Sequence, residues 1–379
     1  MRIDRLDFVD GISKLEKDIS KSTGNFVTNI SYWNPGESYQ NRMLSVLDLP
    51  INVNPIEYIY GYQLTDEYKA SVLKNLGVDG VDSTCVIMQS STAAIALLAN
   101  FLKCMNNKKV CILQPSYFSV GLCLDSFCLD THFLNMNLEQ GDFTIPVQKI
   151  LDMGYDVVWI TSPVFCVGKY YTNRQIANIN KLIKHNIMVI CDEALCEPGQ
   201  ELIRVIPPSK YLISFYSPHK VISVNSVKFA TIVCDRDYLI LLEHLADTFH
   251  GGLSASNTVA LEHYMSKNYK DCFIEFDKFT KENLCIVKAV LNSMPEIFLL
   301  DDTHGQYATI FMPSVPYQKT LSLEFIEGII RSTNISILPG RTMGFDSGYG
   351  FCFRINLTLN PNVLSSSIRK IIQYLSKLK

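Results

Sequence analysis

Short apolar runs alternate with helical patterns through the middle of the chain. The runs are rich in β-branched or aromatic residues and carry apolar residues on both faces, and they cover residues 109–113, 157–160, 187–191, 211–215 and 229–234. Strands that are apolar on both faces are typical of a mostly parallel sheet covered by helices. The pattern therefore predicts that these runs are buried strands of one sheet.

Two of the intervening segments have the spacing of an amphipathic helix. Residues 91–104 place Ile95, Leu98 and Leu102 on one face, and a second segment opens at Thr172 and ends near His185. Strands that alternate with helices favour an α/β domain with a parallel sheet.

The pattern changes from about residue 272 onward. A long helical pattern is followed by alternating strands and by a final helix with apolar residues from Leu364 to Leu378 at helical spacing. This predicts a smaller α+β domain. We expect a large domain at residues 48–265 and a small domain at 266–379, which the N-terminal segment 1–47 joins.

Composition narrows the class of protein. The chain has 379 residues, of which 47% are hydrophobic, and a formal net charge of -3. This balance gives no reason to expect nucleic acid or a membrane surface as partner. The first twenty residues contain no apolar run, and the twelve cysteines include no CxxC pair. We therefore expect a cytoplasmic protein without a bound metal.

Three points at strand or helix ends carry polar residues. Asp192 directly follows a buried strand, Ser217, Lys220 and Lys228 lie between two strands, and a run of small residues from Ser90 precedes a helix. Ligands of parallel α/β sheets bind where strands end and helices begin. Taken singly, each point also fits an ordinary helix cap or a solvated loop.

In this order and spacing, the three points resemble fold-type-I pyridoxal-phosphate enzymes of the class I and II aminotransferase family. The resemblance extends from about Asn29 to Leu378. It implies a large domain with a seven-stranded, mostly parallel sheet flanked by helices. It also implies that Lys220 carries pyridoxal 5'-phosphate as a Schiff base and that Asp192 pairs with the ring nitrogen.

The resemblance implies further roles. Tyr117 would stack on the pyridine ring, and Arg354 would bind the substrate α-carboxylate. The cofactor phosphate would be held by Ser91, Thr92, Ser217 and Lys228. Tyr58, with Tyr60 as second choice, would reach the phosphate of a neighbouring subunit, which predicts a homodimer with shared active sites. Trp33 and Asn34 would line the side-chain pocket, or form an ordinary Pro-Gly turn.

The sequence departs from the family at several positions. In the loop bracketed by Pro163 and Gly168, Phe165 stands where the family usually has Asn, and Leu195 stands where it often has Tyr. Both missing groups normally hydrogen-bond the phenolic oxygen of the cofactor. Lys228 also replaces the usual Arg. His219, directly before Lys220, either lies near the cofactor or faces away from it, and we favour the second interpretation.

The predicted activity is amino-group transfer between an amino acid and a 2-oxo acid. Phe165 and Leu195 keep open another reaction of an amino acid on the same fold: elimination or replacement, decarboxylation, cyclisation or oxidation. A cofactor-binding scaffold without turnover is a third possibility, which the Lys220–Asp192 pair disfavours because a scaffold needs neither residue.

Overall fold

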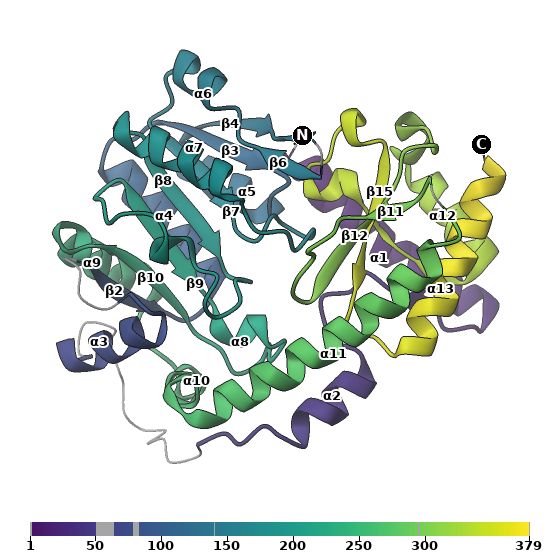
Figure 1. Ribbon diagram of the computed structural model, residues 1–379, viewed down its shortest axis with the longest axis horizontal. Helices are drawn as coiled ribbons and strands as arrows, with labels where there is room; N and C mark the ends of the chain where they lie inside the picture. The colour runs from purple at the N-terminus through teal and green to yellow at the C-terminus, as the bar shows by residue number, and fades with distance from the viewer. Residues whose placement is uncertain (1, 51–63, 79–82, 140, 295, 379) are drawn as a thin grey trace. The chain divides into compact units, whose positions relative to one another are not determined.

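The computed structural model describes residues 2–50, 64–78, 83–139, 141–294 and 296–378 (Figure 1). Contacts divide the chain into two compact units. The first, called here the small unit, comprises residues 1–45, 165–169 and 275–379; the second, the large unit, comprises 46–164 and 170–274. Within the described residues, no helix combines the length and the apolar character that crossing a membrane requires.

The large unit is built on a seven-stranded sheet with the strand order β2-β10-β9-β8-β7-β3-β4. Its strands are β2 (Ser83–Met88), β3 (Lys109–Gln114), β4 (Asp130–Asn135), β7 (Val157–Thr161), β8 (Met188–Glu193), β9 (Leu212–Tyr216) and β10 (Ala230–Asp235). Strand β10 is antiparallel to both neighbours, and the other neighbouring strands pair in parallel. The predicted α/β class with a mostly parallel sheet is therefore confirmed.

All five apolar runs are strands of this sheet, with bounds that differ from the prediction by one or two residues. The pattern missed β2 and β4. Strand β4 lies at the sheet edge and its residues Asp130 to Phe133 are exposed or half-buried, so it lacks the apolar run that marks a central strand.

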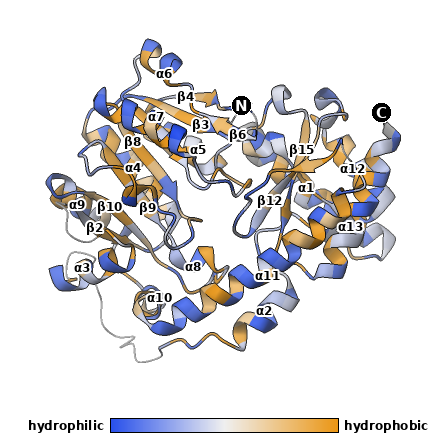
Figure 2. Ribbon diagram, viewed as in Figure 1, coloured by the Kyte–Doolittle hydropathy of each residue, from blue (hydrophilic) through white to orange (hydrophobic). Residues whose placement is uncertain are grey.

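Helices cover the two faces of the sheet (Figure 1). On one face, α4 (Ser91–Cys104), α5 (Phe118–Ser126) and α9 (Leu239–His250) share a buried apolar core with alternate residues of the central strands. Helix α7 (Asn173–Lys184) packs on β8 and α6 (Val147–Met153) packs on α7. The hydropathy colouring shows apolar residues concentrated on the strands (Figure 2). Both predicted helices of this unit form, and α4 has the predicted bounds.

The small unit contains a four-stranded antiparallel sheet of order β11-β12-β15-β14, formed by β11 (Phe298–Leu299), β12 (Tyr307–Met312), β15 (Phe351–Asn356) and β14 (Leu338–Pro339). Helices α1 (Arg2–Thr23), α12 (Leu323–Thr333) and α13 (Pro361–Leu375) contribute to its apolar core. The N-terminal segment also enters this unit through β1 (Thr28–Asn29), which pairs in parallel with β13 (Ile335–Ser336).

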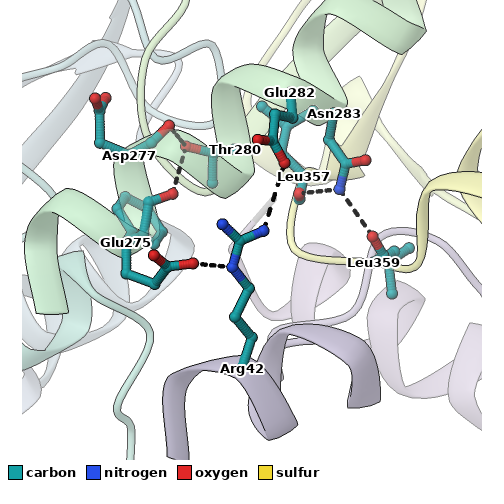
Figure 3. A network of polar contacts seen from close by, with 9 residues as sticks. Arg42, Glu275, Asp277, Thr280, Glu282, Asn283, Leu357 and Leu359 are labelled. Carbon is teal, nitrogen blue, oxygen red and sulfur yellow. Dashed lines mark hydrogen bonds and ion pairs between the residues drawn. The ribbon is translucent and has the colours of Figure 1, made fainter. Parts of the chain in front are cut away.

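Polar contacts fasten α2 (Glu37–Leu44) to the long helix α11 (Lys267–Leu291) within the small unit (Figure 3). Arg42 pairs with Glu275, and its Nη1 lies 3.4 Å from a carboxylate oxygen of Glu282. Beside Glu282, Asn283 Nδ2 donates to the carbonyls of Leu357 and Leu359 at 2.7 and 2.8 Å. These bonds hold the chain just after β15, the strand that carries Arg354.

Candidate active site

Asp192 lies near the carboxyl end of β8, in register with Thr161 of β7 and Phe215 of β9. Its side chain is buried, and its Oδ1 accepts a hydrogen bond from the backbone N–H of Ala194 at 3.2 Å. Burial raises the pKa of this carboxyl to about 6, while the charge of Lys220 and the Ala194 bond act in the opposite direction. Asp192 is therefore a buried carboxylate that needs a cationic partner.

Lys220 lies on α8 (Pro218–Val221), a single turn in the connection between β9 and β10. Its Nζ lies 3.4 Å from Ser91 Oγ at the start of α4 and 5.6 Å from the centre of the Tyr117 ring. Because Lys220 also lowers the pKa of Asp192, these four residues from separate elements lie close to one another. The structure thus brings together the central residues of the predicted cofactor site.

The start of α4 offers donors for an anion. Ser90 is its N-cap, and the Ser90 Oγ accepts from the N–H of Ala93 at 3.2 Å. Ser91 and Thr92 follow as the first helical residues, whose N–H groups have no partners within an α-helix. These groups and the positive end of the helix dipole suit a phosphate. Ser91 is buried and Thr92 is exposed.

The other two residues that are predicted to hold the phosphate, Ser217 and Lys228, lie near the two ends of the connection between β9 and β10. Ser217 is buried and its hydroxyl donates to the carbonyl of Phe229 at 3.0 Å. Lys228 is half-buried, and its carbonyl accepts from Asn257 Nδ2 at 2.7 Å. The same Nδ2 donates to the carbonyl of Gln89 at 3.0 Å, so one amide ties the Lys228 segment to the loop before α4.

Asn257 does not stand out in the sequence as a residue of this region. The available signal was its place in a capping box: Ser254 caps α10 (Ala255–Met265), and Ser254 and Asn257 exchange side-chain-to-backbone hydrogen bonds. That pattern predicts a helix start but says nothing about the distant carbonyls that the amide reaches.

This donor set fits pyridoxal phosphate. The cofactor has an aldehyde that suits the Lys220 amine, a ring nitrogen that suits the Asp192 carboxylate, and a phosphate that suits the start of α4. Tyr117 provides an aromatic face beside the Lys220 amine. Within the described residues, no cluster of His, Cys, Asp and Glu could hold a metal ion.

In the small unit, Arg354 is 1% exposed and its guanidinium contacts two aromatic rings. Its Cζ lies 3.7 Å from the ring centre of Trp33 and 4.6 Å from that of Tyr307. Its Nε donates to the carbonyl of Ser31 at 3.0 Å. Among the described residues, no carboxylate pairs with this guanidinium. A buried cation of this kind calls for an anion, and a planar fork suits a carboxylate.

The other predicted substrate residues differ in setting. Trp33 is half-buried against Arg354, whereas the side chain of Asn34 is exposed and its carbonyl accepts from Asn356 Nδ2 at 2.9 Å. The aromatic cluster around Trp33 includes Phe165, and the two ring centres lie 6.3 Å apart. Tyr58 and Tyr60 lie outside the described residues.

The loop bracketed by Pro163 and Gly168 has one position that only glycine suits. Gly168 has a φ of +76°, and a Cβ there would lie 2.2 Å from the carbonyl oxygen of His304. The N–H of His304 donates to the Gly168 carbonyl at 2.9 Å. The close approach of two backbone segments therefore requires this glycine.

Glu193, the last residue of β8, is a second buried carboxyl. Its Oε2 accepts from the Tyr216 hydroxyl at 2.6 Å, and its Oε1 accepts from the Leu202 N–H at 2.7 Å. Burial raises the pKa of this carboxyl to about 7. Successive residues of a strand point to opposite faces, so Glu193 points away from the face that Asp192 occupies. Its bonds fasten the segment after β8 to the sheet.

Solved structures share this fold along nearly the whole chain. An aminotransferase from Mycobacterium tuberculosis matches with a TM-score of 0.78 at 14% identity over 98% of this chain and 96% of that chain. A kynurenine aminotransferase from Pyrococcus horikoshii matches with 0.77 at 12% identity over 96% and 94%. A PLP-bound C-S lyase from Staphylococcus hominis matches with 0.72 at 15% identity over 93% and 92%.

No curated protein sequence matches the chain. The family model for aminotransferase class I and II matches residues 59–371, which include every candidate site residue of the large unit except Tyr58, and Arg354 of the small unit. With the sheet topology, the site geometry and the shared fold, this match shows that the chain belongs to the aminotransferase class I and II family of fold-type-I pyridoxal-phosphate enzymes.

Proposed function

We propose that the chain is a pyridoxal-phosphate-dependent aminotransferase that moves an amino group between an amino acid and a 2-oxo acid. The observation that carries the proposal is the juxtaposition of Lys220, Asp192, Ser91 and Tyr117. An amine, a carboxylate, a phosphate-binding helix start and an aromatic face are the groups that this chemistry requires.

The bound cofactor supplies an aldehyde for the amino group and a protonated ring that accepts the electron pair of the substrate Cα–H bond. Asp192 would hold the proton at the ring nitrogen, because a carboxylate in a buried site strongly favours a cation beside it. Tyr117 would hold the ring by stacking. Lys220 would anchor the cofactor, and its amine would serve as the base that takes the substrate Cα proton and returns it.

Arg354 would bind the α-carboxylate of the amino acid. Trp33 and Tyr307 contact the guanidinium with their rings, and its Nε and Nη2 donate to the Ser31 carbonyl, so a carboxylate would bind the N–H groups that these contacts leave. Since an arginine stays charged at all relevant pH values, an anionic substrate would offset the cost of burying that charge. We further propose that the active form is a homodimer in which Tyr58 contributes to the neighbouring site.

A second candidate function is another reaction of an amino acid, such as β-elimination. Phe165 and Leu195 have apolar side chains that cannot hydrogen-bond the phenolic oxygen of the cofactor. A C-S lyase shares the fold. Incubating the purified holoenzyme with amino acids and 2-oxoglutarate separates the candidates, because transfer forms a new amino acid and an oxo acid, whereas elimination releases ammonia.

The anchor itself is tested by borohydride reduction of the holoenzyme followed by peptide mass analysis. We expect the label on Lys220 alone, and we expect Lys220→Ala to lose the label and about 10⁴-fold or more of the turnover, since it removes both the attachment and the proton-transfer group. Lys228→Ala serves as the matched control and should keep the label. A label on Lys228, or on no lysine, would contradict the assignment.

A further inference from the structure

The turn that carries Lys220 is held from its far side by residues of α10 and α11. Tyr269 donates from its hydroxyl to the Pro218 carbonyl at 2.9 Å. His219 is fully buried, and its Nε2 lies 2.9 Å from Nδ1 of His263, which is also buried. His263 Nε2 in turn lies 2.9 Å from Oδ1 of Asn268. All of these residues belong to the large unit.

The orientation of the Asn268 amide is fixed by two backbone groups. Its Oδ1 accepts from the N–H of Asp48 at 2.9 Å, and its Nδ2 donates to the carbonyl of Val46 at 2.8 Å. A flipped amide would set donor against donor and acceptor against acceptor. The atom that faces His263 is therefore an oxygen, and His263 must carry a proton on Nε2 to bond it.

This orientation sets the protonation of both imidazoles. Burial lowers the pKa of His263, although Asn268 and the charge of Asp48 oppose the shift, so the ring is neutral and its Nδ1 is an acceptor. His219 must then donate from Nε2. Burial and His263 lower the pKa of His219 to about 3, so this ring is neutral as well. Its Nδ1, which lacks a proton, has no hydrogen-bond partner in the described part of the chain.

We propose that His219, His263 and Asn268 form a hydrogen-bonded chain of fixed polarity that positions the turn bearing Lys220 for attachment of the cofactor. The inference rests on the proposed function of Lys220. Helix α8 has only four residues, too few to hold its own shape, so side-chain bonds from neighbouring elements must hold it. His219 adjoins Lys220 in sequence, and any loss of the His219–His263 bond acts directly on the lysine backbone.

The titratable groups that face the pair are few. Tyr269 contacts both imidazole rings from α11, Asp48 acts on His263 from the segment after α2, and Lys220 is adjacent on α8. At the other end of the chain of bonds, Cys272 Sγ donates to Asn268 Oδ1 at 3.6 Å. The bond between the two rings needs one shared proton, so a further proton on the pair goes to His219 Nδ1, which has no acceptor in the described part of the molecule. Protonation therefore adds a buried charge without a partner beside Lys220, and a carboxylate placed at position 268 should make this arrangement sensitive to pH.

The test uses Asn268→Asp, which places a carboxylate against His263 Nε2 and stabilises a protonated ring. The rate of cofactor attachment to the cofactor-free chain is measured from about pH 6 to 8.5 and divided by the wild-type rate. We expect this ratio to fall about tenfold from the upper to the lower end of this range, since protonation leaves a buried donor without an acceptor at His219 Nδ1. Dividing by the wild-type rate removes the pH dependence that comes from groups titrating alike in both proteins.

Two further variants make the result specific. His263→Phe keeps a ring but removes the nitrogen that accepts the hydrogen bond from His219. It should lower the attachment rate roughly 2- to 10-fold, and its rate divided by the wild-type rate should not change with pH. His185→Gln, at an exposed histidine, should match the wild type at every pH. A flat ratio for Asn268→Asp, or wild-type attachment by a folded His263→Phe, would overturn the proposal.

A readout without cofactor separates this inference from the proposed function. Both histidines have folded-state pKa values below the unfolded value, so the unfolded chain takes up protons below about pH 6.5 that the folded chain does not. The free energy of unfolding should therefore fall more steeply with decreasing pH in the wild type than in His263→Phe. Equal slopes would refute neutral buried histidines, whereas a wild type that attaches no cofactor would refute the proposed function instead.

Discussion

The large and small units each bury charged side chains, but the partners of these charges differ. In the large unit, Asp192 and Lys220 attract each other, and burial alone would drive the carboxyl toward its neutral form. In the small unit, Arg354 is nearly inaccessible and is surrounded by Trp33, Tyr307 and the Ser31 carbonyl, with no carboxylate partner among the described residues.

The difference follows from the chemistry of the two cations and the carboxyl. A buried carboxyl can accept a proton and a lysine can lose one, so the Asp192–Lys220 pair can adjust its charge when a ligand enters. A guanidinium cannot lose its proton and must find an anion or polarizable rings. Among the described residues, the large unit thus contains both charges of its pair, whereas the small unit leaves one charge that a ligand could neutralise.

The largest expected effect is a loss of turnover on changing the charge pair of the large unit. Asp192→Asn should lower the turnover number about 10²- to 10³-fold, because an amide cannot hold the proton on the ring nitrogen. Asp152→Asn, at an exposed carboxylate of α6, is the control and should leave turnover unchanged. Turnover of Asp192→Asn within a few-fold of the wild type would show that the charge pair is not required.

The same substitution has a pH-dependent effect on the cofactor-free chain. The carboxyl ionises near its ordinary pKa of about 4 when unfolded but at about 6 when folded, so its contribution to the free energy of unfolding is lost as pH rises through this window. Asp192→Asn lacks this loss. Its stability relative to the wild type should therefore be higher at about pH 7 than at about pH 4, measured by denaturant unfolding.

A smaller effect is expected from the small unit. Arg354→Lys should raise KM for the amino acid about 10- to 100-fold, since the lysine keeps the charge but loses the fork that binds a carboxylate bidentately. Covalent attachment of the cofactor should be unaffected. Arg331→Lys on the exposed face of α12 is the control. An unchanged KM would mean that the buried guanidinium serves packing alone.

The smallest effect is expected from Trp33, whose ring contacts the Arg354 guanidinium. Trp33→Leu should raise KM about 3- to 10-fold, because it removes one cation–π contact that orients the guanidinium. The chain has two tryptophans, and Trp159 is fully buried in the core of the large unit. An emission change on adding amino acid that is present in the wild type and absent from Trp33→Leu would place the ligand beside Trp33. An equal change in both proteins would exclude that position.

The sequence predicted the large unit well because its central strands are apolar on both faces. Such runs differ plainly from their surroundings, whereas β4 at the sheet edge does not. Asp192, Lys220 and Ser91 stood out because each follows a strand or opens a helix, where ligands of parallel sheets bind. The family resemblance then grouped them and added Tyr117.

Contacts between residues distant in sequence could not be predicted. Asn257 reaches the carbonyls of Lys228 and Gln89, and His219 meets His263 across 44 positions. These bonds depend on how α10 packs, which no local pattern encodes. The prediction that His219 turns away from the cofactor rested on chance orientation, while the structure supplies a partner for its ring: a buried acceptor on α10.

The antiparallel pairing of β10 with β9 has a consequence for how the site could vary. Both ends of the segment between them are fixed by register, with Thr231 opposite Tyr216, and the segment carries both lysines of the proposed site. An inserted or deleted residue there would displace Lys220 and Lys228 in a single event. The length of this connection should therefore tolerate less change than the identity of its side chains.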